Sequence, residues 1–164
     1  MLTVLPLSNE SASDRASVLR VFVEAASYTA LVEGRPPSES DVDDFFFGKP
    51  VSKAFADKTV FGFYAGQDMI GCADVIRAYP AHDCIWIGLM LFSEGHQGRG
   101  YGRAALRLLF EMAATWGYRT AQLAVVATNA RAYAFWKREG FAEIRRASNA
   151  RFTGELIVMQ RAIL

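Results

Sequence analysis

The 164-residue sequence has only two cysteines and two histidines. Cys72 and Cys84 are too few for a disulfide framework and are not spaced as metal ligands, so we expect small buried thiols in a reducing compartment. His82 and His96 stand alone and give no metal-binding pattern. Because 18 basic residues nearly balance 17 acidic ones, no strongly basic surface is expected to bind nucleic acid.

Long apolar runs are also missing. No stretch approaches the roughly 20 apolar residues that a membrane span needs. The first ten residues, MLTVLPLSNE, have neither the basic segment nor the long apolar segment of a signal peptide. We therefore expect a cytoplasmic protein without a membrane partner. The sequence does have 52% hydrophobic residues over a length typical of one domain, so residues 1–164 are predicted to share a single core.

Hydrophobic periodicity predicts seven strands, at residues 3–7, 59–65, 69–77, 84–92, 121–127, 141–146 and 155–162. It also predicts four helices, at residues 16–31, 41–47, 103–116 and 129–140. A helical crossover joins the strands at 84–92 and 121–127, so these two should be parallel. The three strands between 59 and 92 should form an antiparallel meander. The predicted fold is α/β, with a mixed sheet and helices on both faces.

The most distinctive stretch is the glycine-rich turn QGRGYG at residues 97–102, between a buried strand and a helix. Such a turn can hold an anion, because glycines permit close approach and the first N–H groups of a helix lack internal partners. A Walker loop is excluded, since Gly-Lys followed by Ser or Thr is absent. A Rossmann fingerprint is excluded by the glycine spacing and by the lack of a later acidic residue. The pattern Gln/Arg-x-x-Gly-x-Gly/Ala fits at Gln97, Gly100 and Gly102.

This turn and a second segment together resemble the GNAT superfamily of N-acetyltransferases. The second segment matches the family pattern Asn-x-x-Ala-x-x-Phe-Tyr, followed by Gly-Phe, at Asn129, Ala132, Phe135, Gly140 and Phe141. The motifs cover residues 84–141, and the order of elements extends the resemblance to nearly the whole chain. The resemblance implies one N-acetyltransferase domain, a mostly antiparallel GNAT-like sheet with splayed central parallel strands, and acetyl-CoA as co-substrate without a metal.

The resemblance also implies how acetyl-CoA is bound. The turn would bind the pyrophosphate through backbone N–H groups, and the strand before it would pair with the pantetheine arm. One N–H of Leu91 or Phe92 would polarise the thioester carbonyl. The predicted cofactor-binding residues are Leu91, Phe92, Gln97, Gly98, Arg99, Gly100, Tyr101, Gly102, Asn129 and Trp136.

In this family an amine attacks the thioester directly, so the amine must first lose a proton. For a lysine-like amine with a pKa of about 10.4, this costs roughly 4.6 kcal/mol at pH 7. Asp74 is the candidate general base, because it shares a strand face with Cys72 and Ile76 and would be desolvated, with a raised pKa. Alternatively, Asp74 pairs with Arg77 or lies at the solvent edge of the sheet.

The departing thiolate then needs a proton, which the family usually takes from the tyrosine of its second motif. That position holds Trp136, whose indole has no proton to transfer near neutral pH. Tyr133 lies three residues earlier and near the same helical stripe as Asn129, so it is the candidate substitute acid. Water or the product amine are alternative proton sources.

The acceptor is predicted to be a primary amine of a small molecule or peptide. Tyr28, Glu33 and Arg35, next to the rigid Pro36–Pro37 pair, are candidates for selecting an amine with a polar tail. Alternatively, this segment only joins two helices. The sequence leaves the oligomeric state open, although the family often forms dimers. Because Trp136 departs from the family pattern, a non-catalytic acyl-CoA-binding module for sensing or interaction is the alternative function.

Overall fold

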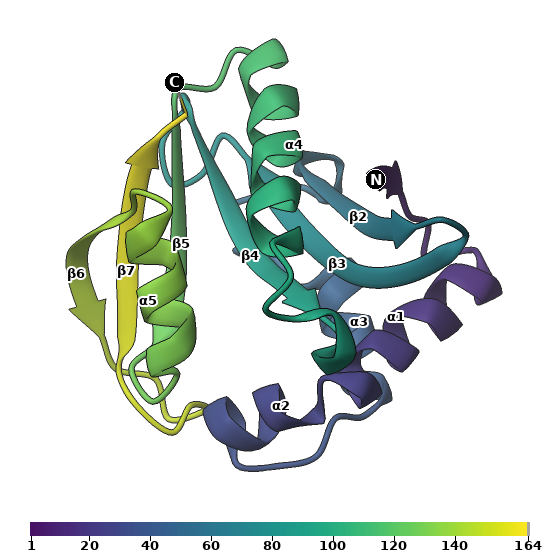
Figure 1. The fold of residues 1–164 in the computed structure, drawn as a ribbon. Coiled ribbons are helices and arrows are strands. Elements are labelled where there is room, and N and C mark those ends of the chain that lie inside the picture. The colour runs from purple at the N-terminus through teal and green to yellow at the C-terminus, as the bar shows by residue number, and fades with distance from the viewer. Residues whose placement is uncertain (164) are drawn as a thin grey trace.

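Seven strands form one mixed sheet in the computed structural model, which describes residues 1–163 (Figure 1). Their order across the sheet is β1-β2-β3-β4-β5-β7-β6, and only β4 and β5 run parallel. The strands are β1 (Leu2–Pro6), β2 (Lys58–Ala65), β3 (Asp68–Arg77), β4 (Cys84–Phe92), β5 (Thr120–Val126), β6 (Ala142–Ala147) and β7 (Leu156–Ala162). The predicted fold class is confirmed.

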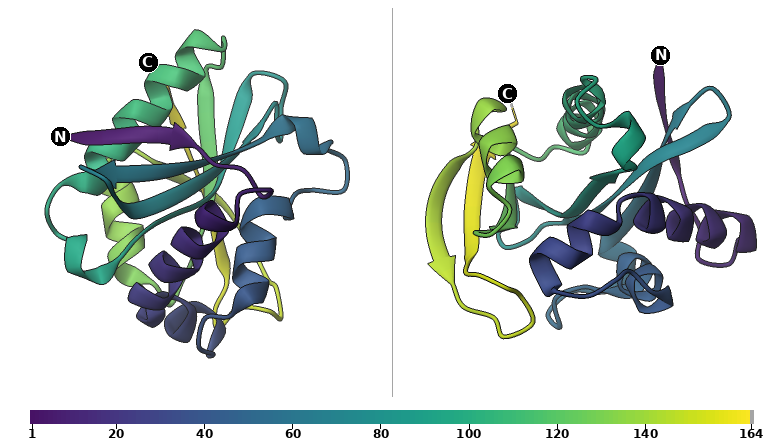
Figure 2. Two further views of the ribbon diagram at one scale, coloured as in Figure 1. Left: turned by 90° about the vertical axis from the view of Figure 1, so that its right-hand side faces the viewer. Right: turned by 60° about the horizontal axis from the view of Figure 1, so that its bottom comes forward.

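Helices cover both faces of this sheet (Figure 2). The α-helices are α1 (Ala12–Glu24), α2 (Ala26–Glu33), α3 (Glu39–Phe47), α4 (Tyr101–Thr115) and α5 (Ala130–Arg138), and the short 3-10 helices are η1 (Phe55–Asp57) and η2 (Glu94–His96). Side chains of α4 and α5 pack on one face, and those of α1 and α3 pack on the other. Within residues 1–163, no helix is long and apolar enough to span a membrane.

Alternation along β4 divides its side chains between two apolar layers. Phe92 belongs to the layer under α4, where its ring stacks on Phe63 with 5.5 Å between centroids. Leu91 belongs to the layer under α1 and α3, with Val21 and Phe45. Burying a side chain of this size stabilises the fold by about 1.5–3 kcal/mol. Both faces of β4 are therefore covered, as its unbroken apolar sequence predicted.

The predicted helix at residues 16–31 is wrong, because the structure has two helices there. The break lies at Ala25, whose φ of −117° and ψ of 36° are not helical. A distant residue supports the start of α2, since the Glu94 carboxylate accepts a hydrogen bond from the Ser27 N–H at 3.1 Å and another from its hydroxyl. Periodicity within residues 16–31 carries no sign of a contact with a residue so far along the chain.

The central strands β4 and β5 separate partway along their length. They pair only over Cys84–Ile87 and Thr120–Leu123, although both strands continue beyond that point. Past the paired region they diverge, so that the two backbones form a V in Figure 1, and we call the region between these two backbones the opening. The splayed parallel strands predicted from the family resemblance are therefore present.

A β-bulge in β4 lies where this separation begins. Asp74 of β3 pairs with Leu89, whereas Val75 pairs with Ile87, so Gly88 is left as the extra residue. A bulge bends its strand and increases the local twist. Gly88 thus turns β4 away from β5 at the start of the opening.

Candidate active site

Past Ile87, the edge of the β4 backbone that faces β5 is not paired with that strand. The Ser93 N–H donates to the Ile70 carbonyl at 3.0 Å, so these two residues form a hydrogen-bonded pair. Because such pairs alternate along antiparallel strands, Leu91 also directs its N–H to β3. Met90 and Phe92 direct theirs into the opening. This geometry corrects the prediction for Leu91 and identifies Met90, which the sequence did not suggest, as a backbone donor in the opening.

The glycine-rich turn connects η2, directly after β4, to the start of α4. The Gln97 side chain folds back, and its Nε2 donates to the Phe92 carbonyl at 2.8 Å. Gly98 and Gly100 have φ values of 73° and 84°, which cost other residues about 1–2 kcal/mol each. Gly100 is the N-cap of α4 and provides no side-chain cap, so the first N–H groups of this helix receive no partner from the cap side chain, as a site for an anion would require.

The remaining turn residues have different surroundings. The Tyr101 ring stacks on Phe92 with 6.4 Å between centroids, so it supports the strand end through packing. Arg99 is exposed. A Cβ at Gly102 would lie 3.1 Å from the Phe135 ring, which shows how closely α4 approaches α5 here.

Arg131, which matches no family motif, also lies beside the turn. Its Nη2 is 3.8 Å from where a Cβ on Gly98 would be. The Asn129 side chain accepts a hydrogen bond from the Ala132 N–H at 3.2 Å, so it caps α5 and fixes the helix start next to the turn. A cation in the first turn of a helix opposes the helix dipole. That unfavourable position was the available sequence signal that Arg131 has a role other than helix stability.

Asp74 is buried in the middle of the sheet, on the face covered by α1 and α3. Its carboxylate lies across Gly88, where a Cβ would be 2.2 Å from Oδ1. Burial raises the pKa of Asp74 to about 7, although the nearby Lys58 ammonium and the Gly88 N–H act in the opposite direction. Arg77 is not its partner, because that guanidinium donates to the Ala56 carbonyl. The two alternatives to a base role for Asp74, pairing with Arg77 and a place at the solvent edge of the sheet, are therefore wrong.

Comparison with known families agrees with this geometry. A sequence model of the Acetyltransferase (GNAT) family matches residues 23–141, which include β4, the turn, β5 and the whole of α5. The chain belongs to the GNAT family of acetyltransferases. A search of curated proteins finds no match.

Solved GNAT structures have the same fold over the whole chain. An acetyltransferase from Thermus thermophilus is 28% identical, with a TM-score of 0.77 over 99% of this chain and 97% of that one. The ribosomal-protein-S18-alanine N-acetyltransferase from Escherichia coli is 20% identical, with a TM-score of 0.71 over 99% and 94%. At 20% identity the second likeness concerns the fold alone.

The position of the usual GNAT tyrosine lies in the core of this protein. Trp136 is buried between Phe135 and Phe141, with ring centroids 4.9 Å and 5.1 Å away. The Tyr133 hydroxyl donates to Glu143 Oε2 at 3.2 Å, on strand β6. Its partner strand β6 is separated from β4 in the sheet by β5 and β7. This contact engages the hydroxyl with β6 and favours another proton source, and the acid role of Tyr133 stays a prediction.

We expect Tyr133→Phe to leave acetyl transfer unchanged over the whole pH range of activity. The variant loses only an exposed hydrogen bond, which should cost the fold about 0.5 kcal/mol or less. Steady-state thiol release measures the first effect and urea unfolding the second. Glu143→Gln is the matched variant and should behave alike. A selective loss of turnover at high pH in Tyr133→Phe alone would restore the tyrosine as an acid.

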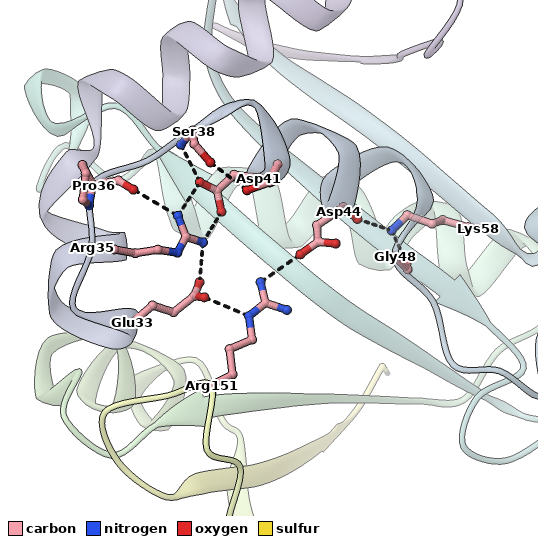
Figure 3. Close-up of polar contacts among 10 residues, drawn as sticks. Glu33, Arg35, Pro36, Ser38, Asp41, Asp44, Gly48, Lys58 and Arg151 are labelled. Carbon is pink, nitrogen blue, oxygen red and sulfur yellow. Dashed lines mark hydrogen bonds and ion pairs between the residues drawn. The ribbon is translucent and has the colours of Figure 1, made fainter.

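Two of the predicted acceptor residues belong to a charged network between α2, α3 and the β6–β7 loop (Figure 3). Arg35 donates to Glu33 at 3.1 Å and to Asp41 at 2.6 Å. Arg151, from the loop between β6 and β7, donates to Glu33 at 2.8 Å and to Asp44 at 2.9 Å. In this network, Glu33 and Arg35 therefore form ion pairs that connect the two helices and the loop.

Uncharged contacts hold the same loop against α2. The Thr153 N–H donates to the Val32 carbonyl at 2.8 Å, and its hydroxyl donates to the Leu31 carbonyl at 2.7 Å. These bonds satisfy carbonyls at the C-terminal end of α2. The loop thus lies against the C-terminal end of α2, a placement that sequence periodicity did not predict.

Tyr28 lies within the electrostatic influence of this network and of Asp74. It is partly buried against the apolar layer under α1 and α3. Burial, followed by the negative charge of Glu33, raises the pKa of Tyr28 to about 12, and Asp74 adds to the shift. The hydroxyl therefore stays protonated at neutral pH and can donate to an acceptor molecule.

Two further features complete the site region. Within residues 1–163, no group of three or more His, Cys, Asp or Glu side chains is placed to hold a metal ion. A groove of about 740 Å³ lies between α4, the end of α5 and the end of β7. None of the predicted site residues lines it; its charged lining consists of Arg103, Arg107, Glu111, Arg138, Glu139 and Arg161.

Proposed function

We propose that the protein transfers the acetyl group of acetyl-CoA to a primary amine of a small molecule or peptide. The opening between β4 and β5 carries this proposal, because Met90 and Phe92 present unpaired backbone groups there. The amide-containing pantetheine arm can pair with such an edge as an added strand would. The α4 N-terminus beyond Gly100 would then receive the pyrophosphate.

The distribution of charge supports this orientation of donor and acceptor. Residues 1–92 contain seven basic and 12 acidic residues, a net charge of −5. Residues 93–164 contain 11 basic and five acidic residues, a net charge of +6. An anionic nucleotide is attracted to the second part, which includes Arg131 and the groove beside α4. A cationic amine is attracted to the first.

The proposed reaction uses two groups on opposite sides of β4. The Met90 N–H donates to the thioester oxygen while the amine nitrogen attacks the carbonyl carbon. Asp74 accepts the proton lost by the amine, directly or through one water, and a pKa of about 7 suits this role at neutral pH. The carbon–sulfur bond then breaks, and water protonates the CoA thiolate. The products are the N-acetylated amine and CoA.

A panel of amines with acetyl-CoA tests the proposed function. We expect CoA thiol to appear in step with an acetylated amine for at least one class of acceptor. Tight CoA binding without turnover on any amine would instead support the non-catalytic acyl-CoA-binding module. Failure to bind CoA would reject both functions. Cytoplasmic location and homodimer formation, suggested by the sequence, stay predictions.

A further inference from the structure

Lys58, at the start of β2, has a buried ammonium group. Its Nζ donates to the Asp44 carbonyl at 3.4 Å and to the Gly48 carbonyl (Figure 3). Gly48 is the C-cap of α3, so the lysine supplies a donor to its carbonyl and a second donor to the Asp44 carbonyl, which already accepts the Gly48 N–H at 2.7 Å. Lys58 thus holds the end of α3 against the sheet.

The same ammonium group lies against Asp74. The distance from Nζ to Asp74 Oδ1 is 3.8 Å, and only 4% and 9% of the two side chains are exposed. Burying a charge is costly unless an opposite charge accompanies it. Each member of this pair therefore stabilises the charged form of the other, and the α3 carbonyls fix the lysine in position.

Other titratable groups near Asp74 cannot supply that positive charge. Tyr28 of α2 and Cys72 of β3 are neutral when protonated, and burial raises the pKa of both. Asp44 of α3 is acidic, and its carboxylate pairs with Arg151 at 2.9 Å. Lys58 is the cation in direct contact with the Asp74 carboxylate.

We propose that Lys58 is a positioning residue that keeps Asp74 ionised and directed across Gly88 toward the opening between β4 and β5. This inference rests on the proposed function, in which Asp74 accepts the proton of the amine. Because Lys58 is bound to the end of α3, and Asp44 of α3 is bound to Arg151, the pair is connected to the β6–β7 loop beside the acceptor (Figure 3). The lysine was not predicted, since only the fold brings it to Asp74.

Carboxyl ¹³C NMR titration of the free protein tests the electrostatic part. The Asp74 signal is assigned by its loss in Asp74→Asn. In Lys58→Met, the midpoint of this signal should rise by about 1–3 pH units, since an opposite charge at this distance has that effect. Lys58→Arg should keep the wild-type midpoint. Lys53→Met is the control, because that lysine pairs with Asp57 at 3.4 Å instead, and it should cause no shift.

An unchanged midpoint in Lys58→Met would overturn the proposal. If Lys58→Met does not fold, the reciprocal titration decides: the pKa of Lys58, followed by ¹⁵N NMR, must fall in Asp74→Asn. An unchanged lysine pKa would again reject the pairing.

A kinetic measurement tests the catalytic part. The acid limb of the plot of kcat/KM against pH should shift to higher pH in Lys58→Met and should lie at the wild-type pH in Lys58→Arg. A purely structural role would not produce this shift. An acid limb that stays in place in Lys58→Met would reject the positioning role. A midpoint shift by NMR in a protein that acetylates no amine would leave the pairing in place and reject the proposed function.

Discussion

Asp74→Asn is expected to lower kcat/KM at pH 7 by about 10²–10⁴-fold, the range over which a positioned general base contributes. The amide has the size of the carboxylate but cannot accept a proton, so the buried site should keep its shape. Steady-state thiol release with the best amine measures the effect. Asp68→Asn, at the exposed start of the same strand, is the control and should retain full activity. An Asp74→Asn enzyme with wild-type turnover would require a different base.

The same substitution should change the pH dependence of stability. The unfolded Asp74 releases its proton near pH 4, whereas the folded one holds it to about pH 7. The contribution of Asp74 to the free energy of unfolding is therefore full below about pH 4, and it is lost as pH rises through about 7. The loss amounts to roughly 4 kcal/mol at about 1.36 kcal/mol per unit. Urea unfolding across this range should show wild type losing stability relative to Asp74→Asn. A relative gain would contradict the assignment.

Gly88→Ala is expected to be the second most damaging change. The new methyl group would lie 2.2 Å from Asp74 Oδ1 and 2.9 Å from its Cγ, so the carboxylate or the β4 backbone must move. Overpacking of this kind typically costs about 1–3 kcal/mol. Displacement of the base should also reduce turnover toward the level of Asp74→Asn. Urea unfolding and steady-state kinetics measure the two effects.

Two variants show whether Asp74 causes the damage. Gly95→Ala is the matched control, because a Cβ there meets nothing within 4 Å, and it should be nearly silent. In an Asp74→Ala background the clash is absent, so Gly88→Ala should cost little additional stability. Equal destabilisation in both backgrounds would place the strain in the β4 backbone instead.

The sequence predicted the parts of the site that depend on neighbouring residues. The glycine spacing at Gly98, Gly100 and Gly102 and the cap at Asn129 are local, and the family motifs identified both. Strand and helix periods likewise gave the order of elements, because each depends on a short stretch of apolar residues.

The missed residues depend on contacts between distant segments. The direction of the Met90 N–H follows from strand pairing, and the contact of Lys58 with Asp74 follows from the packing of α3 on the sheet. Tyr133 was predicted from its helical stripe, but a stripe does not show which strand lies beneath it. Here that strand is β6, and Glu143 takes the hydroxyl.

The contact between Glu94 and Ser27 has a consequence for redesign of acceptor specificity. The same short segment shapes the cofactor turn on one side and begins helix α2 on the other. Loops that alter acceptor choice can be exchanged freely only where the donor site does not depend on them. Residues 148–152 fulfil that condition better than α2, because Arg151 bonds to Glu33 and Asp44, whereas Thr153 and Glu155 bond to Thr128 and Ala127 just before Asn129. Libraries built at residues 148–152 of the β6–β7 loop should therefore retain donor binding more often than libraries built in α2.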